Sequence, residues 1–234
     1  SDLTVKPATL FNNNRSDYAP VLLNEGKDRQ LYFTTTRTAT QGNQLSGITG
    51  LKNGDIYVAN VDEKGNWKRP EAISAVNTAD DEGAVCFSPD GKTMYLTVCP
   101  THPQYPRPAR IYTSARADAS WSKPQPLELL SDTLSNMAHP AISPDGRWLY
   151  FVSDMPGGEG ETDLWRAELK ENKAGRIVEN LGPQINTPGR EMFPTFRPYG
   201  TLYFSSDGRG GMGGLDLFRA TQDTISGRWT VETL

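Results

Sequence analysis

The sequence predicts an all-β protein made of four copies of one unit of about 55 residues, and three observations support this. A glycine turn followed by an aromatic β-type run recurs four times, with the glycines at positions 26, 91, 146 and 200. Glycine (22 residues) and proline (17) are more frequent than usual, as expected for a chain with many turns. No stretch sustains a helical 3.6-residue hydrophobic period beyond a turn or two.

Each unit divides into four short strands. The first precedes the glycine turn, and the second is the aromatic run after it, as at 150–153. The third carries an aromatic residue two positions in, such as Tyr57 or Trp165. The fourth begins near Trp67, Trp121, Ile177 and Trp229. Because prolines 70, 124 and 126 fall in the fourth strand and proline is tolerated only at a sheet edge, this strand should be the outermost one.

Tandem four-stranded units cannot bury both of their faces alone, so they pack against one another in a ring, which is a β-propeller. We expect one domain over residues 1–234, with repeats at about 17–76, 82–131, 137–185 and 191–234. Residues 1–16 resemble a fourth strand that precedes the first complete repeat and are expected to be the outer strand of the closing blade. This phase favours a five-bladed parent; four blades with one redundant strand are the alternative.

Composition restricts the function classes. Lysine and arginine (24) against aspartate and glutamate (28) give a net charge of -4, which disfavours a nucleic-acid binder that relies on a basic surface. No run approaches the roughly 18 apolar residues of a membrane-spanning helix. We therefore expect no nucleic-acid partner and no direct membrane insertion.

The connections from the second to the third strand are long, whereas the turns from the first to the second strand are short. Long loops on a rigid scaffold are where binding usually occurs, so the face that carries them is the candidate functional face. Tyrosine and arginine are enriched at protein interfaces. The expected anchors for a protein partner are Arg37, Tyr105, Arg107 and Arg209.

Acidic residues recur at the start of the innermost strand. The positions nine residues before each turn glycine are Asp17, Glu82, Met137 and Glu191. Three carboxylates near the channel mouth could hold a cation, or could act as the acids of a five-bladed glycosidase. The interpretation we favour is that a wide, hydrated channel mouth tolerates acids there.

The glycine-rich segments 153–158 and 206–214 are followed by strands and not by the helix that a phosphate loop requires. Their aspartates should instead bond loop amides and hold the turns in shape, and calcium binding is the alternative. These aspartates are Asp154, Asp163, Asp207 and Asp216. No other cofactor is expected.

Three further expectations concern polar residues. An asparagine or aspartate lies 14 residues before each turn glycine and should form an Asx-type turn from the outer to the next inner strand; these residues are Asn12, Asn77, Asp132 and Asn186. Cys86 and Cys99 should not pair, because their offset across the hairpin is too large for a disulfide. The two histidines, His102 and His139, lie in different units and exclude a multi-histidine metal site within this chain.

The repeat resembles a known family. The Ser-Pro-Asp-Gly turns at 88–91 and 143–146, each followed by an aromatic strand, look like the PD40 repeat of TolB-like (WD40-like) propellers. The segment 203–218 is similar to a variant found in propellers of large OmpA-family outer-membrane lipoproteins of Bacteroidota. The first unit departs from the pattern, with Asn24-Glu25-Gly26 at the turn and an insertion over 38–53.

This resemblance implies a non-catalytic, periplasmic protein-interaction scaffold that is associated with the outer membrane and with type IX secretion. Its partners would be envelope proteins, and it would reach peptidoglycan only through another domain of the parent chain. The alternative from the residues themselves is a glycan-binding or glycoside-hydrolase-like propeller that uses Asp17, Glu82 and Glu191.

Overall fold

A computed structural model describes residues 8–11, 16–24, 26–36, 54–101, 104, 107–130 and 134–234. This part of the chain forms antiparallel strands in four sheets, with two short 3-10 turns at Gly26–Asp28 and Pro198–Gly200. No helix in it is long and apolar enough to cross a bilayer. The predicted all-β class and the four-sheet organisation are therefore confirmed.

Every sheet is built from consecutive strands, with the first strand innermost. The first sheet contains β1 (Asp17–Leu23), β2 (Gln30–Thr35), β3 (Asp55–Ala59) and β4 (Glu71–Ala72). The second contains β5 (Asp81–Phe87), β6 (Thr93–Cys99) and β7 (Arg110–Ala117), which pairs with both β8 (Ser120–Trp121) and β9 (Gln125–Pro126). The third contains β10 (Met137–Ile142), β11 (Trp148–Ser153), β12 (Asp163–Lys170) and β13 (Lys173–Asn180). The fourth contains β14 (Glu191–Phe196), β15 (Leu202–Ser206), β16 (Asp216–Gln222) and β17 (Trp229–Thr233).

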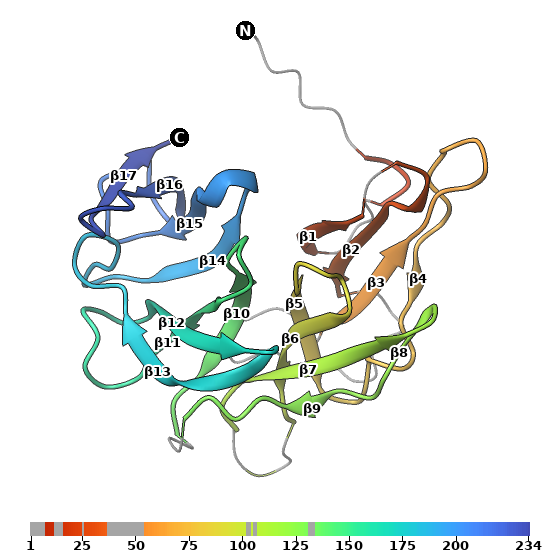
Figure 1. Cartoon of the computed structure of the whole chain (residues 1–234), viewed down its shortest axis with the longest axis horizontal. Coiled ribbons are helices and arrows are strands. Elements are labelled where there is room, and N and C mark those ends of the chain that lie inside the picture. Colours follow the sequence, from red (N-terminus) through yellow and green to blue (C-terminus); the bar gives the residue numbers. More distant parts are fainter. Residues whose placement is uncertain are drawn as a thin grey trace, which may run out of the picture.

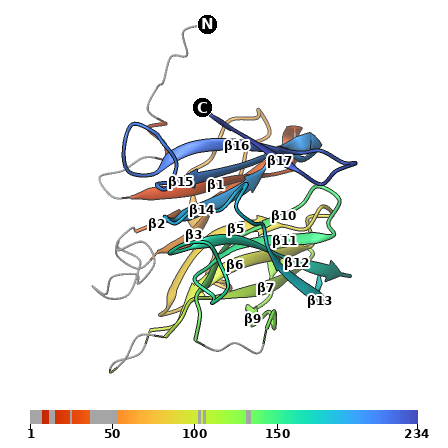
Figure 2. The same cartoon turned by 90° about the vertical axis from the view of Figure 1, so that its left-hand side faces the viewer.

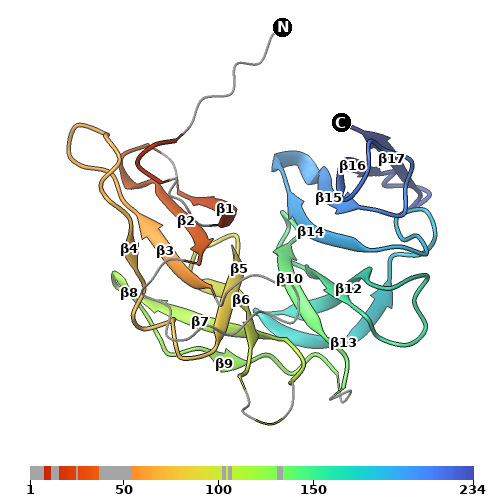
Figure 3. The same cartoon turned by 180° about the vertical axis from the view of Figure 1, so that it is seen from behind.

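The four sheets follow one another around an axis, and β1, β5, β10 and β14 lie nearest to it (Figure 1). Each sheet packs against the next one in the sequence. Between the strands of the first and the fourth sheet, the structure describes no packing of comparable extent, and Figure 3 shows these two sheets on either side of an opening. The arrangement is thus a propeller-like ring of four sheets.

The Ser-Pro-Asp-Gly turns have the same local structure in both copies. Ser143 Oγ donates to Asp145 Oδ1 (2.5 Å) and accepts from Trp148 N (3.0 Å). Gly146 adopts φ 71°, which favours glycine because other residues meet a steric penalty there. Ser88, Asp90 and Gly91 repeat these contacts. The motif therefore fixes a hairpin turn and carries no chemistry of its own.

All four innermost strands contain a β-bulge at the same place, at Ala19, Ala84, His139 and Phe193. These residues have φ between 45° and 52°, which is unusual for residues other than glycine. In three sheets the bulge amide donates to a side chain of the preceding sheet. The acceptors are Thr34 Oγ1 for Ala84 (3.0 Å), Thr97 Oγ1 for His139 (2.9 Å) and His139 Nδ1 for Phe193 (3.3 Å).

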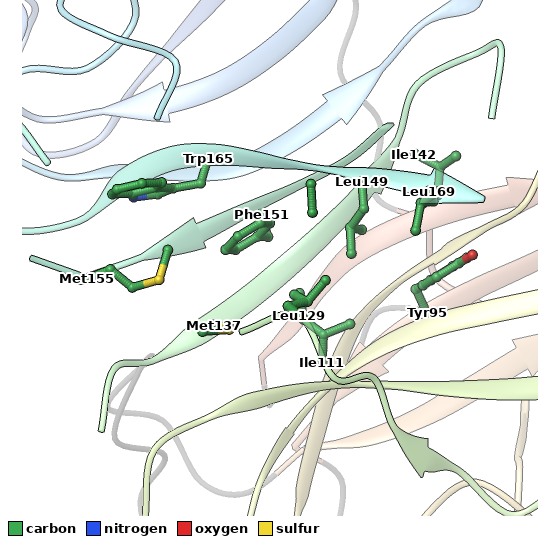
Figure 4. Close-up of a cluster of buried hydrophobic side chains, with 11 residues drawn as sticks. Tyr95, Ile111, Leu129, Met137, Ile142, Leu149, Phe151, Met155, Trp165 and Leu169 are labelled. Atoms are coloured by element: carbon green, nitrogen blue, oxygen red, sulfur yellow. The ribbon is translucent and has the colours of Figure 1, made fainter. Parts of the chain in front are cut away.

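The hydrophobic core lies between neighbouring sheets and not within any one of them. Three clusters fill the first, second and third junctions. Figure 4 shows the middle cluster, in which Tyr95 and Ile111 of the second sheet face Leu149 and Phe151 of the third. Burying such a side chain contributes roughly 1.5 to 3 kcal/mol, so each sheet depends on its neighbours for stability.

The predicted outer strand at the N-terminus lies largely outside the described residues. Its described part, residues 8–11, forms a turn and not a strand. The ring of Phe11 packs edge-on against Phe33 (centroids 6.0 Å apart) and Trp67 (5.8 Å). Whether residues 1–16 belong to a closing blade stays a prediction.

Candidate functional site

Glu82 and Glu191, two of the predicted channel-mouth acids, are buried and bonded to the connection that precedes them. Glu191 accepts hydrogen bonds from Thr187 N (2.9 Å), Thr187 Oγ1 (2.6 Å) and Ser206 Oγ (2.6 Å). Glu82 accepts bonds from the backbone amide and the hydroxyl of Thr78 in the same way. Because each carboxylate closes a local turn, its first role is structural.

The structure does not bring the three predicted acids together as a metal site. The charges that act on Glu82 are those of Asp55 and Asp80, whereas the charge that acts on Glu191 is that of Asp163. Asp17 lies on β1 opposite Thr35, and Met137 begins the third inner strand. Over the described ranges, no three histidine, cysteine, aspartate or glutamate side chains are placed to hold a metal ion.

A different acidic cluster lies where the first sheet meets the second. It consists of Asp55 at the start of β3 and of Asp81 and Glu82 at the start of β5, which are 5%, 7% and 1% exposed. Gly54 N donates to Asp81 Oδ1 (2.7 Å), and Glu82 N donates to Gly54 O (3.1 Å), so the two strand ends are bonded directly. Of these three acids, only Glu82 was predicted from the sequence as a candidate site residue. Asp55 occupies the same repeat position as Asp163 and Asp216, and this recurrence in the sequence could have identified it.

Burial changes the protonation of this cluster. It raises the pKa of Asp55 to about 6, with the charge of Asp81 adding to the effect. It raises the pKa of Glu82 to about 7, against the stabilising hydrogen bonds from Thr78. Glu82 Oε2 is buried and has no hydrogen-bond partner among the residues that the structure describes. Such pKa values suit general acid–base chemistry, but buried structural acids acquire them as well.

The loop face is shaped by the predicted aspartates. Asp163 accepts hydrogen bonds from Glu159 N (2.5 Å) and Gly160 N (3.2 Å) within the β11–β12 loop, and Asp216 accepts a longer one from Gly213 N (3.4 Å). Asp154 and Asp207 instead accept bonds from Asn136 N and Arg190 N, in the connections to the next inner strand. The prediction that these aspartates bond loop amides is thus confirmed for Asp163 and Asp216. It is wrong for Asp154 and Asp207, which tie their loops to a neighbouring connection.

The β11–β12 loop, residues 187–190 and the β15–β16 loop form one connected surface, which we call the loop platform. Glu161 N donates to Gly189 O (3.0 Å), and Arg190 Nη2 contacts Asp207 Oδ2 (2.7 Å). Glycines allow this close packing: a Cβ atom on Gly160 would lie 2.1 Å from Thr187 O. Figure 2 shows the β15–β16 loop on the opposite side of the molecule from the β16–β17 turn.

The predicted partner-binding anchors that the structure describes differ in their exposure. Arg107 is exposed. Arg209 is half-buried, and its Nη2 donates to Gln184 O (2.5 Å) and Ile185 O (2.9 Å), so it mainly holds the platform to the preceding turn. Arg37 and Tyr105 lie outside the described residues. The most exposed apolar side chain of the platform is Met212, at 100% exposure, and it was not among the predicted anchors.

The predicted Asx-type turns are wrong for the two asparagines that can be assessed. Asn186 Oδ1 accepts from Leu164 N (2.8 Å) and its Nδ2 donates to Leu164 O (3.0 Å). Asn77 bonds both backbone groups of Ile56 in the same way. These side chains therefore bridge to the third strand of the same sheet, 22 and 21 residues away. Asn12 and Asp132 lie outside the described residues.

The remaining sequence predictions concern cysteine and histidine. Cys86 and Cys99 do not form a disulfide with each other, and Cys86 lies opposite Tyr95, as the hairpin arithmetic predicted. His139 is 4% exposed and stacks on Phe193. His102 lies outside the described residues.

Several solved structures have an architecture similar to that of this chain. The chain has a β-propeller fold. A protein of unknown function from Dyadobacter fermentans aligns with a TM-score of 0.58 at 16% identity, over 93% of this chain and 64% of that one. An α-L-arabinofuranosidase from Lactobacillus brevis aligns with a TM-score of 0.56 at 12% identity, over 89% of this chain and 73% of that one.

A puromycin hydrolase aligns with a TM-score of 0.54 at 18% identity, over 96% of this propeller but only 32% of the hydrolase. TolB from Acinetobacter baumannii also matches, with a TM-score of 0.45. No protein-family model matches the chain, and no curated protein matches it either. At these identities the likeness shows the propeller fold alone, and a fold does not determine a function.

Proposed function

We propose that this propeller is a non-catalytic protein-interaction scaffold that binds its partner through the loop platform. The observation that carries the proposal is the internal bonding of the platform by Asp163, Arg190 and Asp207. A surface that is already ordered loses little conformational entropy when a partner binds.

The burial and local hydrogen bonding of the candidate acids favour a scaffold over an enzyme. A paired-carboxylate mechanism needs two carboxyl groups that face a shared substrate. Glu191 has both oxygens engaged in local hydrogen bonds, and Glu82 is buried against Thr78. Met212 and Leu215, by contrast, expose apolar surface on the platform, at 100% and 41%.

The finer assignment rests on the sequence resemblance. The repeats resemble those of OmpA-family lipoproteins of Bacteroidota, and among these the type IX secretion accessory called PorE is the best candidate. We accordingly place the scaffold in the periplasm, associated with the outer membrane. Its partners are envelope proteins, and peptidoglycan is reached only through another domain.

The test compares two exposed apolar residues at opposite ends of the molecule. Met212→Asp alters the platform, whereas Ile225→Asp alters the β16–β17 turn, where Ile225 is 96% exposed. The tagged protein is incubated with Bacteroidota envelope extract, and the retained proteins are identified. We expect a retained protein that Met212→Asp reduces at least tenfold and Ile225→Asp leaves unchanged. Equal loss in both variants, or no specifically retained protein, contradicts the proposal.

A second candidate is a glycan-binding or glycoside-hydrolase-like function. The raised pKa values of Asp55 and Glu82 favour it, because such shifts cluster at functional sites. Soluble arabinan is the first probe, since arabinan-active enzymes are among the structural neighbours. Reducing-sugar release or calorimetric binding that Glu82→Gln removes would favour this function over the scaffold.

A further inference from the structure

The fourth sheet carries an uncovered face on the side away from the third sheet. Side chains alternate along a strand, so Phe204 and Phe218 pack into the junction with the third sheet while their neighbours point the other way. We call these neighbours the open face: Thr195, Tyr203, Ser205, Leu217 and Arg219. Leu217 is 50% exposed, and Leu234, whose amide donates to Leu217 O, is 57% exposed.

Tyr203 has an equivalent in every other sheet, and each equivalent is buried by the sheet that follows. Tyr32, Tyr95 and Tyr150 are 1%, 0% and 3% exposed. Tyr32 Oη accepts from Trp121 Nε1 of the second sheet (3.2 Å), and Tyr95 Oη donates to Asn172 O of the third (3.2 Å). The ring of Tyr150 packs edge-on against Phe196 of the fourth sheet, with centroids 4.8 Å apart.

Leu217 continues a second row of interface residues. The same position on the third strand holds Ile56, Ile111 and Leu164 in the first three sheets, at 0%, 1% and 0% exposure. Each belongs to the cluster that joins its sheet to the next one. Leu217 keeps the apolar character of this row at half exposure.

Ser205 continues a third row, which accepts the bulge amide of the next sheet. Thr34 and Thr97 occupy this position in the first two sheets and accept from Ala84 N and His139 N. The third sheet has Val152 there, and His139 Nδ1 accepts the amide of Phe193 instead. Ser205 restores a hydroxyl group. Neither Tyr203 nor Ser205 forms a side-chain hydrogen bond with any residue that the structure describes.

The opposite end of the series differs. Phe33 and Tyr57 of the first sheet occupy the positions of Phe204 and Phe218, and they are only 4% and 7% exposed. The chain's own Phe11 packs against Phe33. The first sheet of a second copy is therefore already covered and is a poor occupant for the open face.

From this continuity with three established junctions, we infer that the open face is the docking surface for a fifth antiparallel sheet of the same repeat type. The incoming sheet presents an aromatic or aliphatic residue, equivalent to Phe151 or Phe204, against Tyr203 and Leu217. Its bulge amide donates to Ser205 Oγ. This inference does not depend on the proposed scaffold function, which uses the loop platform.

The test supplies such a sheet to the full chain. A second copy of residues 127–185 is appended after Leu234, so that the third repeat keeps the connection that precedes it. The third repeat is chosen because it docks in this structure against Tyr95, Ile111 and Thr97, which resemble Tyr203, Leu217 and Ser205. We expect one cooperative thermal transition at a higher Tm than that of the 234-residue chain. Amides of β16 should gain hydrogen-exchange protection.

Variants locate the contact. Leu217→Asp should lower Tm by more than about 5 °C in the fusion and by less than about 2 °C in the 234-residue chain, since a shift of this size corresponds to a buried contact in a domain of this length. Ser205→Val should lower Tm in the fusion only. Ile225→Asp, which lies in the β16–β17 turn and not on the open face, should change Tm by the same amount in both chains. Equal effects of Leu217→Asp in the two chains overturn the inference.

A second fusion appends residues 181–234, the fourth repeat with its own connection. It controls for the case in which residues 127–185 fail to dock only because their side chains do not fit the open face. If the appended repeats of both fusions unfold separately and stay unprotected, the inference is overturned. Light scattering of the 234-residue chain tests the competing occupant. A dimer that Leu217→Asp converts to a monomer would assign the face to a second copy and overturn the fifth-sheet inference.

Discussion

His139 stacks on Phe193 with ring centroids 4.1 Å apart and an interplanar angle of 13°, and its Nδ1 accepts the Phe193 amide at 3.3 Å. The two residues are the bulged positions of neighbouring inner strands. Val152 occupies the place where the other junctions use a threonine hydroxyl. The imidazole therefore supplies an acceptor that valine cannot provide. This role requires an unprotonated Nδ1, because a protonated ring nitrogen donates and does not accept.

The His139 contact predicts a loss of stability in acid. Burial lowers the pKa of His139 to about 4 from its usual 6.5. The unfolded chain then binds this proton more tightly than the folded protein, so stability falls as pH decreases from about 6.5 to about 4, by up to about 3 kcal/mol. Urea unfolding of the protein and of His139→Asn at pH 7.5 and 4.5 measures this. The wild type should lose more stability than the variant; identical losses would refute the prediction.

Glu82 predicts a pH dependence of the opposite sign. Its pKa is raised to about 7 from 4.5, so the folded protein binds this proton more tightly than the unfolded chain. Glu82 therefore stabilises the fold increasingly as pH falls from about 7 to about 4.5, by up to about 3 kcal/mol. Glu82→Gln removes this contribution, so the variant should lose stability relative to the wild type as pH falls from 7.5 to 5.0. Glu128→Gln, at an exposed position, is the matched control and should keep the same difference from the wild type at both pH values.

The glycines of the loop platform predict a contrast between two alanine substitutions. Gly160→Ala places a Cβ atom 2.1 Å from Thr187 O and 2.6 Å from Gly189 O, whereas a Cβ atom on Gly210 meets nothing within 4 Å. Backbone atoms cannot rotate away, so Gly160→Ala should cost about 1 to 3 kcal/mol and Gly210→Ala almost nothing. Thermal unfolding of both variants decides this. Similar Tm values would show that the platform yields easily.

The asparagine bridge predicts a large effect from a single side chain. Asn186 is 2% exposed and pairs with both backbone groups of Leu164. Asn186→Leu keeps the number and branching of the side-chain heavy atoms but leaves a buried N–H and C=O without this partner, at a cost of about 2 to 4 kcal/mol. Ser226→Ala, in the exposed β16–β17 turn, provides a comparison that should cost less than about 1 kcal/mol. A loss below 1 kcal/mol in Asn186→Leu would mean that another donor and acceptor replace the amide.

The repeat itself was predictable, because its signals are local. The glycine at 146 and the serine and aspartate before it determine a hairpin through contacts within five residues. The prolines in the fourth strand predicted the sheet edge. Pro126 indeed lies on an outermost strand, β9, and is paired with Tyr112 of β7. Such features follow from backbone chemistry that does not depend on the remainder of the chain.

The sites were predicted less well, because their partners are distant in the sequence. Asn186 was assigned to a local turn, whereas its partner lies 22 residues away. Arg209 was predicted as an exposed anchor, and its guanidinium is instead bonded to Gln184 O and Ile185 O. Spacing showed that Glu82 and Glu191 occupy equivalent positions, but could not show that each carboxylate bonds the threonine four residues before it.

The sequence alone determined the class, the four units and their strand order, since hairpin turns and alternating strands are encoded within each repeat. Only the tertiary structure decided which side chains the junctions between sheets bury. Tyr150 and Tyr203 occupy the same repeat position, yet one is 3% exposed and the other lies on the open face. The physical reason is that burial depends on the neighbouring sheet, which no single repeat specifies.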